Sequence, residues 1–204
     1  MALVQRDLVR LLTFSSIAHA GYILLGLGIG TQAGVAAALL HTFNHMFMKM
    51  GAFYSTLLMG GRGRVASVAR LRGAAYRMPF AFGLFFVSAL ALVGIPPTHG
   101  FAGKWWLARA SLEQGRLIPV VVIAAGTVIS LSYYARFFAI SLRPDPGVET
   151  PRRRTWAPAV TAIPVAACLI LGIAVSPFLS RFETAAHRLV EPESYARLVF
   201  PEDS

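Results

Sequence analysis

Long runs of apolar residues, separated by short polar segments, dominate the pattern along this chain. A membrane-spanning helix needs about 20 mostly apolar residues, and in hydrocarbon the backbone must satisfy its own hydrogen bonds. No run shows the alternation of apolar and polar positions that marks a membrane barrel. The pattern therefore predicts an all-α, polytopic membrane helix bundle over residues 1–180, followed by a polar tail at 181–204. About five spans are expected, at residues 11–29, 34–60, 78–112, 117–142 and 156–180.

The composition of the 204 residues agrees with a membrane protein and excludes other classes. Hydrophobic residues make up 56% of the chain and charged residues only 14%, whereas a soluble domain carries about 25% charged residues. The same numbers exclude a disordered chain. The single cysteine, Cys168, excludes a disulfide framework and a CxxC metal site within this sequence. The polar start at residues 1–10 runs directly into the first span, so no cleavable signal peptide is expected.

The net charge of +10 comes from 19 basic and 9 acidic residues. Most of the arginines lie before the first span and after the second and fourth spans, at Arg6, Arg10, Arg62, Arg64, Arg70, Arg72, Arg77, Arg143, Arg152, Arg153 and Arg154. With five spans these segments share one side of the membrane. The positive-inside rule then predicts a cytoplasmic N-terminus and an outside C-terminus in a bacterial cell membrane. Docking of lipid headgroups or a partner is the alternative role for these arginines, and no nucleic-acid partner is expected.

Only two of the 19 basic residues are lysines, and both lie in or beside apolar runs, at Lys49 and Lys104. Arginine keeps its proton in proteins, whereas a lysine that is removed from water can release its proton near neutral pH. A charged side chain within a membrane span is costly, so it marks a functional site by default. The alternative is a lysine that extends to the headgroups, and Lys49 lies far from both ends of its span.

A stripe of polar residues surrounds Lys49. His41, His45 and Lys49 follow one another at steps of four residues, and Asn44 lies beside them. Residues four apart share one face of a helix. Groups that titrate near neutral pH and face the interior of a membrane bundle indicate a proton relay, whereas the alternative is a set of core residues with satisfied hydrogen bonds. His19, in the middle of the first span, either joins this path or hydrogen-bonds to a neighbouring helix.

The third span contains a predicted break. Pro96 and Pro97 each lack a backbone donor and clash with the preceding helical turn, and Gly100 adds conformational freedom. Thr98 is expected to cap the half-helix that follows. Broken helices are tolerated inside membranes where protein or a hydrated cavity satisfies the freed groups, and they often mark ion sites. Lys104 lies within two turns of this break, which strengthens its assignment to a functional site.

Three segments resemble signature motifs of the antiporter-like membrane subunits. Residues 10–22, RLLTFSSIAHAGY, resemble the motif (K/R)xxLAYSSIxxxGY. Residues 41–49, HTFNHMFMK, resemble HxxxHxxxK, and residues 94–104, GIPPTHGFAGK, resemble GIPPxxGFxxK. The resemblance covers residues 6–142 well and the fifth span loosely. The family includes ion-pumping subunits of NADH:quinone oxidoreductase (complex I), subunits of Mrp-type cation/proton antiporters and subunits of membrane-bound hydrogenases.

This resemblance implies one half of an ion channel. Subunits of this family have roughly fourteen helices that include two inverted five-helix repeats, each with a broken helix and a buried lysine. By similarity, Lys49 and its histidines belong to the central hydrophilic axis, and Lys104 is the terminal residue that controls exchange with the outside. The first repeat, with its glutamate and lysine, has no counterpart in these residues. The chain is therefore expected to be part of a longer protein or to pair with another chain or segment that supplies the first half-channel.

The leading hypothesis is a proton- or cation-translocating subunit of a redox-driven complex such as NADH:quinone oxidoreductase or a membrane-bound hydrogenase. Its expected partners are other membrane subunits, the lipid bilayer, and protons or monovalent cations. No redox centre, cofactor or metal is expected in the chain itself. The main alternative is an Mrp-type sodium (potassium)/proton antiporter subunit. Two further alternatives are an inactive fragment or scaffold and a b-type haem protein in which His19 and His41 bind the iron.

Overall fold

A computed structural model describes the chain except for residues 1, 61–66, 68–70, 145–156 and 191–204. The loop arginines Arg62, Arg64, Arg70, Arg152, Arg153 and Arg154 and the last part of the tail therefore lie outside the described residues. The described part is helical, with a short 3₁₀ turn at Ala2–Val4. Its helices are α1 (Leu8–Gly28), α2 (Gln32–Gly60), α3 (Ala74–Arg77), α4 (Pro79–Val93), α5 (His99–Glu113), α6 (Leu117–Ser141), α7 (Ala157–Ile173) and α8 (Val175–Val190).

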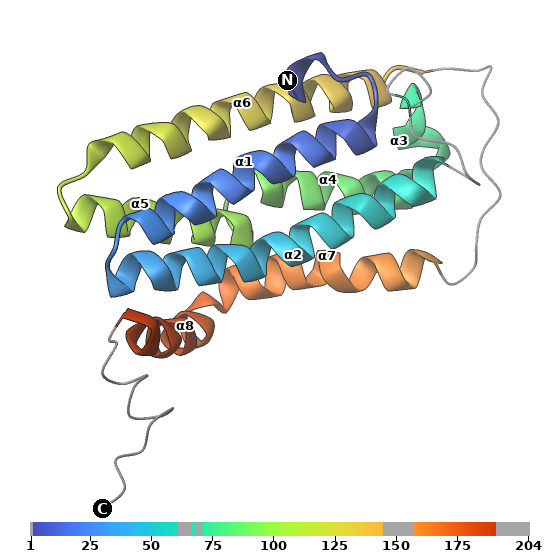
Figure 1. Cartoon of the computed structure of the whole chain (residues 1–204). Helices are drawn as coiled ribbons and strands as arrows, with labels where there is room; N and C mark the ends of the chain where they lie inside the picture. The colour runs from blue at the N-terminus through green and yellow to red at the C-terminus, as the bar shows by residue number, and fades with distance from the viewer. Residues whose placement is uncertain (1, 61–66, 68–70, 145–156, 191–204) are drawn as a thin grey trace, which may run out of the picture.

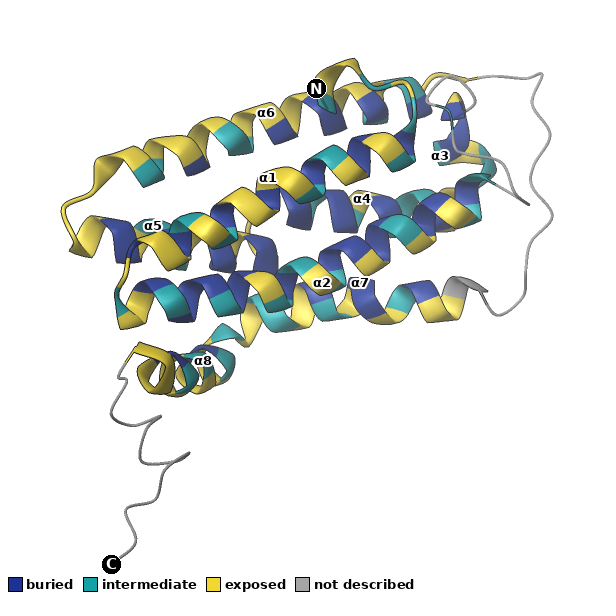
Figure 2. Ribbon diagram, viewed as in Figure 1, coloured by how far each residue is buried: buried dark blue, intermediate teal, exposed yellow. Residues whose placement is uncertain are grey.

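The helix α2 lies at the centre of the bundle. It packs against α1, α4, α5, α7 and α8, and Figure 1 shows the long helices running side by side. The burial pattern follows from this arrangement (Figure 2): α2 is buried on several sides, whereas α1 buries one stripe that includes Leu12, Ser15, His19 and Tyr22. Spacings of three and four residues along that stripe place these side chains on the face toward the interior.

The first helix begins three residues before the predicted span, which starts at residue 11. Asp7 is its N-cap, and its side-chain oxygen accepts a hydrogen bond from the backbone N–H of Val9 at 2.8 Å. An aspartate at this position satisfies backbone donors that have no partner within the helix. The span predicted from apolar residues alone therefore missed the first turn, which is set by the capping residue.

The described helices differ in how well they meet the requirements of a membrane span. By length and hydropathy, α1 and α6 each qualify alone, and the bent pair of α7 and α8 qualifies together. The 29-residue α2 is long enough, but its polar stripe lowers its hydropathy. The third predicted span is divided into α4 and α5, and α4 is a shorter apolar helix. The molecule is thus an all-α membrane bundle in which the polar residues concentrate in α2 and at the α4–α5 break.

The fifth predicted span, residues 156–180, is interrupted in the structure. The helix α7 ends at Ile173, and α8 continues at an angle of 84°. Pro177 explains the end of α7, because its ring would clash with the carbonyl of Ile173 four residues earlier and it has no N–H to donate. The first residues of the predicted tail belong to α8, in which Phe178 and Phe182 pack on Phe43 of α2 at ring-centroid distances of 5.8 and 5.7 Å.

Candidate functional site

The polar stripe of α2 meets α1 through a cluster of three histidines. His19 Nδ1 lies 3.0 Å from His41 Nε2, within hydrogen-bonding distance, and their nearly parallel rings are 5.2 Å apart. The ring of His19 also stacks on His45 at 4.8 Å. His19 and His41 are fully buried, and His45 is half-buried. The structure thus shows the hydrogen bond from His19 to a neighbouring helix, and it places the ring against the polar stripe of α2.

Lys49 extends toward α1 instead of toward the headgroups. Its ammonium group donates a 2.6 Å hydrogen bond to the backbone carbonyl of Leu12, and the side chain is 7% exposed. The hydroxyl of Ser16 donates to the same carbonyl at 3.2 Å. A main-chain oxygen within a helix thus serves as the acceptor for this buried lysine.

The break between α4 and α5 leaves two carbonyl groups without helical partners. Gly94 ends α4 in the left-handed conformation, with φ of 85°, and the N–H of Ile95 donates to the carbonyl of Leu90 at 3.1 Å. This pattern is a Schellman motif, which leaves the last carbonyls of the helix, those of Leu92 and Val93, free to accept other donors. Pro96 and Pro97 follow, joined by a cis peptide bond, before α5 starts at His99.

Lys104 of α5 turns back to this break and binds the free carbonyls. Its ammonium group donates to the carbonyl of Val93 at 2.7 Å and to the hydroxyl of Thr127 at 3.0 Å, with the carbonyl of Leu92 at 3.5 Å. The side chain is 5% exposed. The C-terminal end of a helix carries a partial negative charge, so α4 provides an electrostatically favourable site for a cation.

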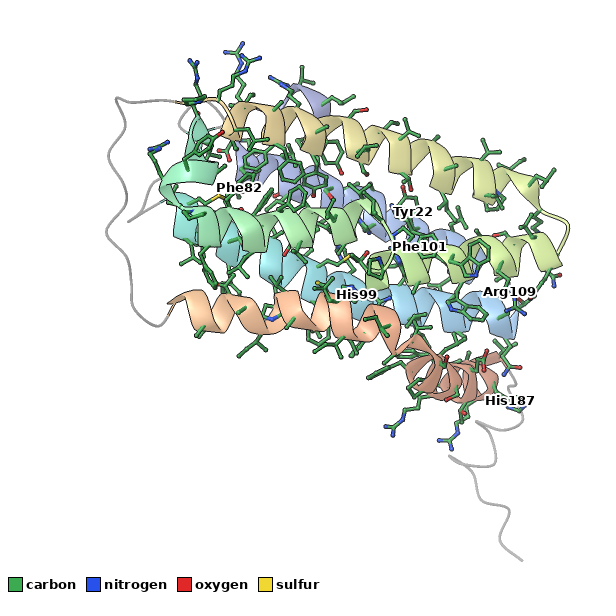
Figure 3. The ribbon with its side chains drawn as sticks, turned by 180° about the vertical axis from the view of Figure 1, so that it is seen from behind. Tyr22, Phe82, His99, Phe101, Arg109 and His187 are labelled. Atoms are coloured by element: carbon green, nitrogen blue, oxygen red, sulfur yellow. The ribbon has the colours of Figure 1, made fainter. Side chains whose placement is uncertain are left out.

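Tyr22 of α1 lies between Lys104 and the histidine cluster. Its ring is 5.3 Å from Lys104 Nζ, and it makes edge contacts with the rings of His19 and His41 at 5.6 and 5.9 Å. Tyr22 and His99 are both labelled in the interior of the bundle in Figure 3. These groups lie in a series, which we call the polar chain, in the order Lys104, Tyr22, His41, His19, His45 and Lys49. The last step, from His45 to Lys49, is one turn of α2.

The glycines around the break allow α5 to approach α2 and α4 closely. A Cβ at Gly103 would lie 2.6 Å from His41 Nδ1, and one at Gly100 would collide with the carbonyl of Ala91 and with Met48. Gly100 was predicted to supply conformational freedom, but it lies inside α5 and its role is close packing. Asn44 fixes the contact by donating a 2.8 Å hydrogen bond to the carbonyl of His99.

The predicted cap at Thr98 is only partly correct. Thr98 occupies the N-cap position of α5, but its side chain makes no capping hydrogen bond. Its hydroxyl donates to the carbonyl of Ile95 at 2.7 Å instead. The tight turn after the two prolines brings this carbonyl within reach of the hydroxyl, which therefore closes the turn and does not cap the helix.

The site contains the six polar residues predicted from the sequence and three residues that were not predicted. The structure brings together all six predicted polar residues, His19, His41, Asn44, His45, Lys49 and Lys104. The missed residues are Tyr22, His99 and Thr127. Tyr22 lies inside the motif at residues 10–22 and His99 inside the motif at residues 94–104, so these motifs could have identified both residues. Nothing local to Thr127 distinguishes it from the other polar residues of its span.

The geometry does not fit the haem alternative. The facing nitrogens of His19 and His41 are 3.0 Å apart, within hydrogen-bonding distance, which leaves no room for an iron and its porphyrin between them. Among the described residues, no group of three or more His, Cys, Asp or Glu side chains could hold a metal ion. Three further ring nitrogens of this cluster, His19 Nε2, His41 Nδ1 and His45 Nε2, are buried and have no hydrogen-bond partner in the described part. They are available to water, which buried polar groups commonly bind.

Comparison with known families supports the resemblance of the motifs. The family described as NADH:quinone oxidoreductase/Mrp antiporter, TM matches residues 1–130. NADH-quinone oxidoreductase subunit N of Desulforudis audaxviator is 35% identical over 186 residues, which cover 86% of this chain and 36% of that protein. Subunit N 2 of Solidesulfovibrio magneticus is 38% identical over 191 residues, covering 92% of this chain and 40% of that protein. The chain thus spans about two-fifths of the length of these curated relatives.

Solved structures share the fold. A chain of the Mrp complex from Dietzia sp. DQ12-45-1b superimposes with a TM-score of 0.88 over 96% of this chain and 45% of that chain. Their sequence identity of 23% shows a common fold alone. A chain of respiratory complex I from Thermus thermophilus with bound aureothin has a TM-score of 0.72 and 30% identity, covering 88% of this chain and 41% of that chain.

Proposed function

This chain belongs to the NADH:quinone oxidoreductase/Mrp antiporter transmembrane family, and from that premise we propose that it translocates protons, or another monovalent cation, as a membrane subunit of a redox-driven complex. NADH:quinone oxidoreductase and membrane-bound hydrogenases are the candidate complexes. The observation that carries the proposal is the polar chain, which joins Lys104 to Lys49 through the middle of the bundle. Its relatives named NADH-quinone oxidoreductase subunit N support its assignment to a redox-driven complex.

The histidines of the polar chain are suited to conduct protons. A neutral imidazole accepts a proton at one ring nitrogen and releases one from the other. The close contact between His19 and His41 lets a proton pass between α1 and α2, and the free nitrogens of the cluster extend the path through water. His45 lies one turn from Lys49 on α2, so the lysine exchanges its proton with this histidine directly or through water.

Lys104 is proposed to control exchange at the other end of the polar chain. The carbonyls of Leu92 and Val93 and the hydroxyl of Thr127 stabilise its ammonium form. Neither lysine contacts a carboxylate in the described structure, so a charge change in a neighbouring subunit acts on each lysine without competition from a fixed anion. In this mechanism the chain moves charge, and electron transfer takes place in its partners.

The other half of the channel is proposed to come from another chain or segment. The chain corresponds to 36–40% of its first two relatives' lengths, and the polar chain forms one relay. Membrane subunits of the same complex are the proposed partners. This proposal is supported by the structural neighbours, which are chains of the Mrp complex, the membrane-bound sulfane sulfur reductase and respiratory complex I.

We propose a bacterial cell membrane with the N-terminus in the cytoplasm and the C-terminus outside. Figure 1 shows the start of α1, the end of α6 and α3 at one end of the bundle, with α8 at the other end. Arg10, Arg77 and Arg143 belong to or adjoin the elements at the first end. This grouping supports the orientation through the positive-inside rule.

The proposal is tested by replacing Lys104 with Met in the native complex. Proton flux into inside-out membrane vesicles is measured per electron transferred from NADH. We expect at least a tenfold lower flux in an assembled complex, because methionine carries no proton. Arg109→Met, which removes an exposed cation from the same helix, is the matched control and retains its flux. Normal pumping in the Lys104→Met variant would overturn the assignment.

A secondary cation/proton antiporter subunit is the second candidate, supported by the fold shared with the Mrp complex. It predicts sodium or potassium flux that is driven by a pH gradient and persists without any electron donor. A scaffold without transport activity instead predicts that Lys49→Met and Lys104→Met both leave flux unchanged.

A further inference from the structure

His99 is a buried histidine at the helix break that the polar chain leaves unused. It is 0% exposed and is the first residue of α5. Its carbonyl accepts the hydrogen bond from Asn44, which fixes it to α2. On the other side, α7 approaches so closely that a Cβ at Gly172 would lie 2.6 Å from the His99 backbone nitrogen. Figure 3 shows His99 inside the bundle between these elements.

The ring of His99 has polar surroundings but no hydrogen bond of its own. Neither ring nitrogen has a partner among the described residues, and the ring lies beside the main chains of Asn44 in α2 and Cys168 in α7. Main-chain N–H groups inside helices are already bonded, so these neighbours offer carbonyl oxygens, which only accept. A protonated ring can donate on both sides, whereas a neutral ring donates on one side and accepts from water on the other. The two carbonyls can therefore accept hydrogen bonds from a protonated ring, and a neutral ring leaves one nitrogen for water.

The position of His99 also connects it to the histidine cluster. Asn44, to which it is bonded, lies between His41 and His45 along α2. The unpartnered nitrogen of His41, Nδ1, faces α5 at Gly103, one turn after His99. An imidazole on this side of α2 thus extends the polar chain from α1 and α2 toward α7.

We propose that His99 is a further proton-carrying residue of this chain, which exchanges protons with His41 and His45 through water. The inference rests on the proposed function and extends it to a branch at the start of α5. Tyr54 in α2 and Arg109 and Glu113 in α5 are exposed to the outside of the bundle. The buried and half-buried titratable groups on the elements around His99 are His41, His45 and Lys49 in α2, Cys168 in α7 and Lys104 in α5, whereas α4 has none. All of these groups are neutral or cationic in their ordinary forms, so a proton on His99 is coupled to protons on its neighbours by repulsion.

The first test examines His99 in the wild-type complex and is independent of transport. This chain has only five histidines, so ¹⁵N-histidine labelling of this subunit alone gives a tractable magic-angle-spinning NMR spectrum in lipid. We expect transfer of magnetisation from water to a His99 ring nitrogen, because a proton-carrying ring must exchange protons with water. A His99 ring that stays dry would overturn the inference, whatever the flux.

The second test measures donor-driven proton flux in His99→Gln, which retains hydrogen-bonding groups but carries no proton. We expect at least a fivefold lower flux in an assembled complex, with normal flux in His187→Gln, an exposed histidine of α8. If Lys104→Met abolishes flux while His99→Gln pumps normally, the His99 inference fails and the proposed function stands. If neither substitution changes flux, the proposed function fails as well. If His99→Gln does not assemble, the NMR result on the wild-type complex decides.

Discussion

The two buried lysines meet backbone carbonyls of different kinds. Lys49 donates to the carbonyl of Leu12, which lies inside the intact helix α1. This carbonyl already accepts hydrogen bonds from the helix backbone and from the hydroxyl of Ser16. Lys104 donates to the carbonyl of Val93 at the end of α4, where no helical N–H competes, and to the hydroxyl of Thr127. The acceptor of Lys49 is satisfied without the lysine, whereas the carbonyl of Val93 depends on Lys104 for its donor.

This difference separates the roles of the two ends of the polar chain. A cation that completes the hydrogen bonding of a broken helix is held in place by the fold. A cation that shares an occupied carbonyl can leave it at smaller cost. Within the proposed function, Lys104 would then act as a gate whose proton is released only when its surroundings change, and Lys49 would pass protons on.

The largest expected effect contrasts Lys104→Met with Lys49→Met. The first substitution leaves the carbonyls of Leu92 and Val93 without a donor, whereas the second leaves the Leu12 carbonyl with its other partners. An unsatisfied buried acceptor costs about 1–3 kcal/mol, so we expect Lys104→Met to lower the free energy of unfolding by about 2 kcal/mol more than Lys49→Met. Denaturant unfolding of the purified subunit in detergent measures both. Equal losses would remove the distinction between the two sites.

The next effect isolates the Lys104 site through Gly94. Its φ of 85° disfavours any side chain, and a Cβ would lie 2.9 Å from Lys104 Cδ. We expect Gly94→Ala to destabilise the protein by about 1–2 kcal/mol and to reduce proton flux. Gly83→Ala, in the same helix with no atom within 4 Å of the new Cβ, is the matched control. Normal flux in Gly94→Ala would show that the lysine does not need this geometry.

A smaller effect is expected from Thr127→Val, which removes one acceptor from Lys104 and retains the side-chain shape. The hydroxyl also donates to the carbonyl of Ile123 within its own helix. Loss of the hydrogen bond from Lys104 lowers stability by about 1 kcal/mol beyond the loss of that intrahelical bond, and we expect a lower donor-driven flux as well. Thr42→Val serves as the control, because the hydroxyl of Thr42 donates to the carbonyl of Ala38 within its own helix. The same loss of flux in both variants would contradict a specific role for Thr127.

The smallest effect concerns the Lys49 site. Ser16→Ala removes one of the donors to the Leu12 carbonyl, and the lysine and the helix remain. We expect a change of stability of about 0.5 kcal/mol or less, as for most partly exposed positions. Proton flux measured in vesicles should stay within twofold of the wild type. A large loss would mean that the Leu12 carbonyl depends on its donors as much as the carbonyl of Val93 does.

The sequence predicted the parts of the molecule that depend on local pattern. Apolar run lengths predicted the helical membrane bundle, and the paired prolines predicted the break in the third span. The spacing of His41, His45 and Lys49 predicted their shared face. These features follow from helix periodicity and backbone chemistry within a few residues.

The missing parts depend on contacts between distant segments. The acceptors of Lys104 come from two helices, at Val93 and Thr127, and no local pattern predicts that these residues meet. The partner of Lys49 is a main-chain group of Leu12, which any residue would supply. The bend before α8 was missed because Pro177 lies within an otherwise apolar segment, and the hydrophobic pattern alone favoured a single span.

The polar character of α2 has a consequence for how the protein is made. Inserting a lysine at the centre of a helix during synthesis costs about 2.5–3.5 kcal/mol, and α2 does not qualify as a span by its own hydropathy. The qualifying helix α1 emerges from the ribosome first, and α2 follows it after three residues. The carbonyl of Leu12 and the ring of His19 are therefore already present when Lys49 and His41 reach the insertion machinery. We expect the two helices to enter the bilayer together as a hairpin, in which α1 supplies partners for the polar side chains of α2.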